Sequence, residues 1–162
     1  MRCCRYISYV LGVVLVVLSI ASCSGEDCPI NNTVMGKMVF YNPYDEPVAF
    51  AGTMNVSVVR PQGDSVVLNR KVNASEITFP LSYKHVTDTF ILDYNDGMAY
   101  DSLYVSHINT PTLVSVDCGT AMFHTITSVK GTNHVIDAVV LKSSEVNYDE
   151  RENIQIIYRI DD

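Results

Sequence analysis

Apolar and polar residues alternate with a period of two along most of the chain beyond residue 33, and no stretch there shows a helical period. Phe90, Leu92 and Tyr94, for example, alternate with Ile91 and Asp93. Because successive side chains of a β-strand point to opposite faces of its sheet, this pattern predicts strands with one buried face. The alternation therefore restricts the chain to an all-β fold.

Turn signals divide the alternating stretches into about eight or nine short strands. Residues 61–64 and 95–97 are expected to form hairpin turns, and residues 109–111 are expected to end a strand over residues 99–107. Pro80 indicates an edge strand, because proline cannot donate a ladder hydrogen bond.

Short strands at this spacing are typical of β-sandwiches. We expect one immunoglobulin-like β-sandwich domain over residues 31–162. A small closed β-barrel is the alternative, because it satisfies the same alternation.

The first 22 residues have the form of an export signal. Arg2 and Arg5 are followed by an apolar run over residues 9–19, which is short for a transmembrane helix, and small residues precede Cys23. This is the pattern of a bacterial lipobox, in which the cysteine thiol accepts a diacylglycerol. We expect residues 1–22 to be the signal peptide and residues 23–30 to be the lipidated Cys23 with a short acidic tether. The alternative is an ordinary secretory signal in which Cys23 has no special role.

Two cysteines of the mature chain, Cys28 and Cys118, remain after Cys23 is assigned to the lipid. Exported proteins form disulfides in oxidising compartments, so we expect a Cys28–Cys118 bridge, with two separate buried thiols as the alternative. Cys118 shares strand parity with Val114 and Val116, which predicts that its sulfur faces the core.

The bridge has a consequence for the position of the domain. Only residues 24–27 separate Cys23 from Cys28, and an extended chain of five residues spans at most about 18 Å. A domain joined to Cys28 would therefore sit close to the membrane that holds Cys23.

The charge of the chain excludes some partners. Without Arg2 and Arg5, the mature chain has nine basic residues against 18 acidic residues, a net charge near −9. Such a charge argues against nucleic acid and against electrostatic adhesion to anionic lipid.

Several segments carry a resemblance to a known family. They are Asp101–His107, Asn109–Pro111, Val114–Gly119, Met122–Ile126, Val146–Asp149 and Glu152–Ile154. Together they resemble a family of small Bacteroidales lipoproteins known only as a domain of unknown function. The resemblance implies a cell-envelope location and a β-rich fold, and it implies no activity.

Histidines are the main candidates for a chemical site. None of His85, His107, His124 and His134 has the close spacing of metal ligands, and the chain lacks a nucleophile elbow, a phosphate loop and a dinucleotide motif. We expect the histidines to be satisfied within the fold, and we expect no cofactor. The alternative is a metal or catalytic site built from His107 and His124 with Asp117.

Two short segments resemble the Asp-Ser/Thr-aliphatic motif of Bacteroidetes O-glycosylation. They place Ser65 and Ser102 as the acceptors. Ser102 lies in an expected strand, where a glycan would have to face solvent.

These features favour a non-catalytic lipoprotein of the cell envelope that binds or scaffolds an envelope protein or a glycan. The acidic segment over residues 24–27 resembles the signal that directs lipoproteins of Bacteroidetes to the outer face of the outer membrane. We therefore expect a surface-exposed protein anchored in the outer membrane through Cys23, with a periplasm-facing protein as the alternative. A lipid-anchored enzyme or metal-binding protein is the alternative function.

Overall fold

The computed structural model describes Cys28 and residues 33–159, and these residues form ten strands and no helix. The expected signal peptide and the Cys23 lipidation site lie outside the described residues. The strands are β1 (Met35–Tyr41), β2 (Thr53–Val58), β3 (Ser65–Val72), β4 (Glu76–Pro80), β5 (Thr87–Tyr94), β6 (Ala99–Ser115), β7 (Gly119–Gly131), β8 (Ile136–Leu141), β9 (Glu145–Val146) and β10 (Ile154–Tyr158).

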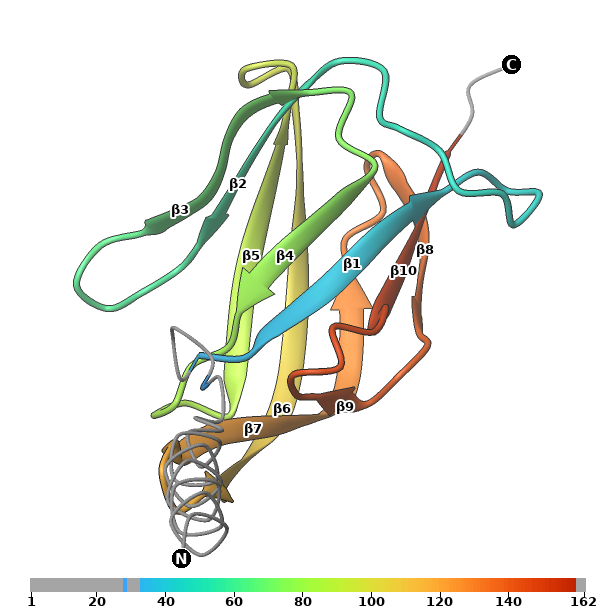
Figure 1. The fold of residues 1–162 in the computed structure, drawn as a ribbon. Helices are drawn as coiled ribbons and strands as arrows, with labels where there is room; N and C mark the ends of the chain where they lie inside the picture. The colour runs from blue at the N-terminus through green and yellow to red at the C-terminus, as the bar shows by residue number, and fades with distance from the viewer. Residues whose placement is uncertain (1–27, 29–32, 160–162) are drawn as a thin grey trace, which may run out of the picture.

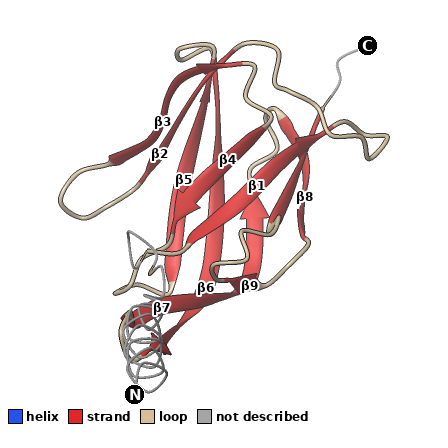
Figure 2. Ribbon diagram, in the orientation of Figure 1, coloured by secondary structure: helices blue, strands red, loops and turns tan. Residues whose placement is uncertain are grey.

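The strands pair into two sheets that pack face to face (Figures 1 and 2). One sheet has the order β4-β1-β10-β8, and the other has the order β3-β2-β5-β6-β7-β9. Strands β1 and β10 pair in parallel, and the named pairings within the six-stranded sheet are antiparallel. This confirms the expected all-β sandwich, and the closed-barrel alternative does not describe the pairing.

The inward face of each strand supplies the core, as the alternation predicts. On β5, Phe90, Leu92 and Tyr94 are buried. Aromatic side chains join the two sheets, because Phe79 of β4 packs edge-on against Phe90 at 5.2 Å between ring centroids. Tyr158 of β10 packs against Tyr94 in the same way at 6.2 Å. The core therefore fixes the two sheets against each other.

Strand β6 is longer than the sequence suggested, and the expected break at residues 109–111 was wrong. β6 continues through Pro111, which pairs with Met122 of β7. Beyond Ser106, β6 is no longer paired with β5. Since this part of β6 has a partner on one side only, the missing N–H of Pro111 leaves the pairing with β7 possible.

The expectation that Cys118 lies on a strand with its sulfur in the core was also wrong. Residues 116–118 form the turn between β6 and β7, and Cys118 is half-buried there. Val116 is 92% exposed. The prediction from alternation failed here because β6 ends at Ser115, and the period of two does not continue through the turn that begins at Val116.

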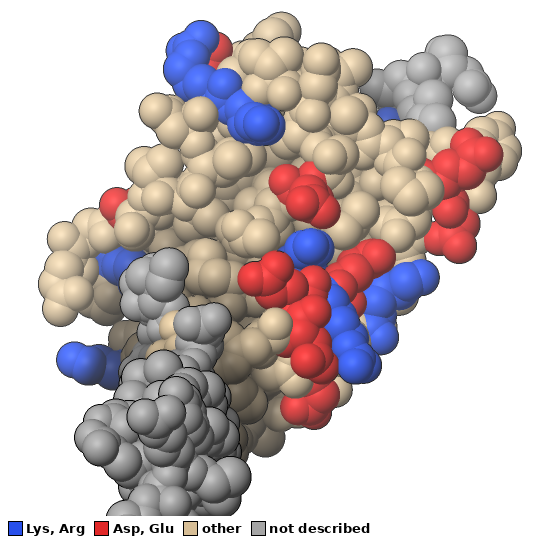
Figure 3. Space-filling view, in the orientation of Figure 1, with Lys and Arg blue, Asp and Glu red and all other residues tan. Residues whose placement is uncertain are grey.

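No helix among the described residues is long and apolar enough to cross a membrane. On the face drawn in Figure 3, acidic and basic side chains lie side by side over the region of β1 and the loop between β9 and β10. Lys37 lies 3.9 Å from Glu76, and Arg151 lies 3.2 Å from Asp149. Opposite charges therefore compensate one another on this face.

Candidate functional site

A disulfide joins Cys28 to Cys118, the pair expected from the sequence, with 5.3 Å between their Cα atoms. Because Cys118 lies in the β6–β7 turn, the bridge attaches Cys28 to the end of a long hairpin. The attachment point is therefore a turn and not the strand that the parity of Cys118 with Val114 and Val116 predicts.

Two of the candidate histidines, His107 and His124, lie together on the inner side of the six-stranded sheet. His107 comes from β6 and His124 from β7, where it pairs with Asn109. Their rings meet edge to face at 5.2 Å between centroids, and each residue is at most 2% exposed. Together with Asp88 of β5 and Asn109 of β6 they form a set of four residues that we call the histidine cluster: Asp88, His107, Asn109 and His124.

The carboxamide of Asn109 holds both imidazole rings. Its Nδ2 donates to the backbone oxygens of Ser82 and His85 at 3.0 and 3.1 Å, which fixes the orientation of the amide. Its Oδ1 therefore accepts from Nδ1 of His107 at 2.8 Å and from Nδ1 of His124 at 2.7 Å. Both histidines thus carry a hydrogen on Nδ1 in this arrangement.

Asp88 completes the other side of the cluster. Its Oδ2 lies 3.1 Å from Nε2 of His107 and accepts the backbone N–H of Ser82 at 2.7 Å. Its Oδ1 pairs with the guanidinium of Arg60, whose side chain is 23% exposed. The backbone N–H of Ser82 and the guanidinium of Arg60 both donate to this buried carboxylate and so compensate for its removal from water.

His124 differs from His107 because its second ring nitrogen is free. Nε2 of His124 is buried and has no hydrogen-bond partner among the described residues. Burial, followed by the nearby His107, lowers the pKa of His124 to about 4. Tyr83 stacks on the imidazole at 5.7 Å between centroids. The imidazole of His124 is therefore neutral, and its Nε2 carries a lone pair. The ring of Tyr83 covers one face of this imidazole.

Asp117 does not join the histidines, so this part of the alternative site was wrong. It is exposed in the β6–β7 turn, eight residues along the chain from Asn109, which corresponds to about 26 Å of extended strand. The described residues contain no group of three or more His, Cys, Asp or Glu that could hold a metal ion. The structure thus assembles two of the three proposed ligands.

His134 also lies apart from the cluster, beside the buried Asp101 at the other end of β6. Nδ1 of His134 contacts the backbone oxygen of Tyr100 at 2.7 Å. The Asp101 carboxylate accepts the backbone N–H groups of His134, Val135 and Ile136 and the hydroxyl of Thr132. This acid therefore ties the start of β8 to β6, which is a structural role.

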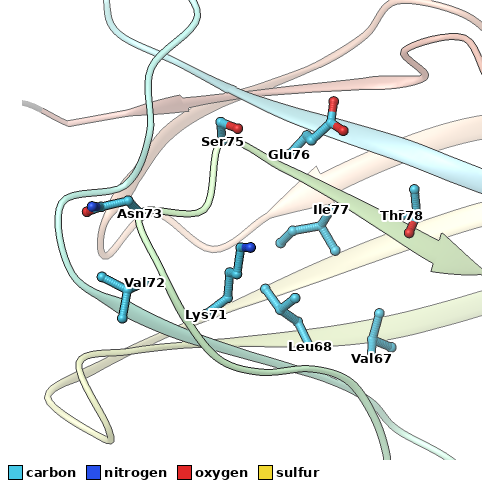
Figure 4. Close-up of a pocket in the computed structure, with 9 residues that line it drawn as sticks. All are labelled: Val67, Leu68, Lys71, Val72, Asn73, Ser75, Glu76, Ile77 and Thr78. Atoms are coloured by element: carbon cyan, nitrogen blue, oxygen red, sulfur yellow. The ribbon is translucent and has the colours of Figure 1, made fainter.

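Two surface recesses lie near edge positions of the fold. One, of about 470 Å³, lies between edge strands β3 and β4, where Leu68 and Ile77 face one another (Figure 4). The other, of about 310 Å³, is lined by residues that include Arg60 and His85 and lies beside the histidine cluster. Both volumes fall within or near the range of small-ligand pockets.

The two serines that resemble glycosylation acceptors differ in exposure. Ser65 is exposed at the start of β3, an edge strand. Ser102 is half-buried in β6, between β5 and β7, and its backbone N–H is held by Thr132. Ser65 therefore offers a hydroxyl to solvent more readily than Ser102.

Sequence reasoning missed Asp88, Asn109 and Arg60. A signal for Asp88 was present, because it shares strand parity with Phe90 and Leu92, both of which are buried. A carboxylate at a core position needs a buried partner. Asn109 was interpreted as part of a turn, which concealed its place beside His124 in the hairpin.

Comparison with known proteins assigns the chain to a family, but the function of that family is unknown. No curated protein and no solved structure matches the chain. The model of a family of unknown function, DUF6452, matches residues 53–158, which span β2 to β10. The chain belongs to this family of unknown function.

Proposed function

We propose that this protein is a lipid-anchored lipoprotein of the cell envelope that binds or scaffolds another envelope component without catalysis. The observation that carries the proposal is the Cys28–Cys118 disulfide. It joins the β-sandwich to a point five residues after Cys23, the cysteine of the lipobox pattern. Two or more acyl chains on Cys23 would make the attachment effectively permanent.

The histidine cluster supports a binding or scaffolding role over catalysis. Three of its four ring nitrogens have partners within the protein. His107 is held between Asp88 and Asn109, and both the histidine and the aspartate are buried. Such a network rigidifies the sheet, and its members are already engaged with one another.

The location of the domain follows from the tether. Residues 24–27 contain Glu26 and Asp27 and resemble the surface-export signal of Bacteroidetes lipoproteins. We propose that the protein faces the outside of the outer membrane, where an envelope protein or a glycan would be its partner. The resemblance to Bacteroidales lipoproteins over residues 101–157 supports the same compartment.

Metabolic labelling with a palmitate analogue tests the anchor. The wild-type chain should take up the label, and Cys23→Ser should not, because serine cannot form the thioether. Ser22→Ala is a matched control that keeps a small residue before the cysteine and should stay labelled. Label retained by Cys23→Ser would overturn the proposal.

Protease treatment of intact cells tests the location. The wild-type domain should be removed, whereas the double change Glu26→Ala and Asp27→Ala should protect it. Equal cleavage of both proteins would show that the acidic segment does not direct export and is only a tether.

A further inference from the structure

The hairpin of β6 and β7 extends past the rest of the sandwich. Residues beyond Ser106 on β6 are paired only with β7, and β9 pairs with β7 only at His124 and Thr125. The end of this hairpin lies at the lower edge of Figure 1. We call residues 111–122 the hairpin tip.

The hairpin tip exposes apolar side chains and carries almost no charge. Val116 is 92% exposed and Leu113 is 65% exposed. Asp117 is the one charged residue between Ile108 and Phe123, in a chain with 29 charged residues. A single exposed apolar residue is ordinary on a protein surface. A protruding turn that exposes two large apolar side chains and has little charge is instead typical of a contact surface.

The disulfide places this surface at the anchored end of the domain. Cys118 is two residues from Val116 and is bonded to Cys28. The chain from Cys28 back to Cys23 spans at most about 18 Å. An acyl chain on Cys23 would therefore keep the hairpin tip within reach of the lipid surface.

We propose that the hairpin tip inserts Leu113 and Val116 into the boundary between headgroups and acyl chains of the membrane that holds Cys23. This inference rests on the proposed lipid anchor. It gives the anchored domain a fixed orientation, because a second contact limits rotation about the tether. The mature chain has a net charge near −9, so the favoured surface is zwitterionic or uncharged lipid, where apolar burial is not opposed by repulsion.

The chain contains no tryptophan, so one introduced tryptophan reports on a single position. The test uses full-length protein purified in detergent and reconstituted into phosphatidylcholine vesicles, with or without lipids brominated near the headgroup end of the acyl chains. Val116→Trp places the probe at the tip. Met98→Trp is the matched control, because Met98 is 82% exposed in the turn before β6, at the opposite end of that strand.

Brominated lipid should quench Val116→Trp strongly and leave Met98→Trp nearly unchanged, because side chains of interfacial segments reach about 5–10 Å into the boundary. Leu113→Trp serves as a second probe if Val116→Trp does not fold, and it should be quenched too. Adding Val116→Asp to Leu113→Trp should relieve that quenching, since a carboxylate opposes insertion.

Mass measurement of the same samples separates the two possible failures. Acylated protein in which the tip probes are quenched no more than the Met98→Trp control would overturn the insertion and leave the anchor standing. Protein without acyl chains would overturn the anchor, and the insertion with it. Quenching of the tip that vanishes when a copurified envelope protein is present would assign the surface to that protein and overturn the lipid assignment.

Discussion

Oδ2 of Asp88 lies 3.1 Å from Nε2 of His107, and both side chains are fully buried. The pair joins β5 to β6 at the point where their pairing ends. The guanidinium of Arg60, two residues after the end of β2, pairs with Oδ1 of the same carboxylate. These three residues therefore form a buried polar network at the end of the β5–β6 pairing.

Removing the charge of Asp88 should destabilise the fold. Asp88→Asn replaces the buried carboxylate by a neutral amide with one acceptor oxygen, so the buried His107 and the partly buried Arg60 lose their charged partner, and breaking such a buried pair costs about 3–5 kcal/mol. Urea denaturation measures the change in the free energy of unfolding. Asp137→Asn is the control, because Asp137 is exposed on β8, and it should change that free energy by less than about 0.5 kcal/mol. Equal effects of the two changes would contradict the role of Asp88.

Stability should fall in acid partly because of His124. The pKa of His124 is lowered to about 4 in the folded protein, against an ordinary value of 6.5 in the unfolded chain. Between these values the unfolded chain binds a proton that the folded protein does not, so stability is full above pH 6.5 and is lost as the pH falls toward 4. The loss from this group amounts to about 3 kcal/mol.

Urea denaturation between pH 4 and 7 measures this effect, with His124→Gln as the comparison. Glutamine does not titrate, so the variant should lose less stability over that range than the wild-type protein. Groups that do not contact His124 contribute equally to both proteins and cancel in the difference. Parallel curves for the two proteins would contradict the lowered pKa of His124.

A side chain at Gly36 should disturb the core. Gly36 lies directly opposite Phe79 on β4, whose buried ring covers it. A Cβ at residue 36 would lie 2.7 Å from Cε2 of Phe79. Gly36→Ala should therefore destabilise the protein by about 1–3 kcal/mol in urea denaturation, as overpacking does.

The double variant with Phe79→Leu tests the cause. Leucine leaves room for the new methyl group, so the double variant should lose less stability than the two single losses predict together. If the losses of unfolding free energy of Gly36→Ala and Phe79→Leu simply add in the double variant, a clash with Phe79 is not the cause of the destabilisation.

The disulfide should stabilise the folded chain. Cys28 and Cys118 are 90 positions apart in the sequence, and closing such a loop contributes about 4–5 kcal/mol in the chain-entropy model. Cys28→Ser with Cys118→Ser should lower the unfolding temperature while keeping the β-sheet signal in circular dichroism. The wild-type protein treated with reductant should match the double variant. An unchanged unfolding temperature would contradict a stabilising bridge.

The sheet architecture could be predicted from the sequence because strand alternation is a local property. Buried Met38 and Phe40 on β1, and Phe90 and Leu92 on β5, fall where the period of two places them. Pro80 marked an edge strand, and β4 is the edge of its sheet. These signals depend only on neighbours in the chain.

The candidate site could be predicted only in part, because it depends on contacts between strands. His107 and His124 come together through the register of β6 and β7, and the sequence does not state that register. Asn109 was assigned to a break because Pro111 follows closely, whereas the one-sided pairing of β6 tolerates the proline. Asp117 was grouped with the histidines by type, although it lies in the turn at the far end of the hairpin.

The intact mass of the protein extracted from membranes with detergent shows whether Cys23 carries the lipid anchor. We expect a chain that begins at Cys23, carries a diacylglyceryl group with its acyl chains, and gains the mass of two alkylated thiols only after reduction of the Cys28–Cys118 bridge. A chain that begins elsewhere, or that begins at Cys23 without acyl groups, would contradict it.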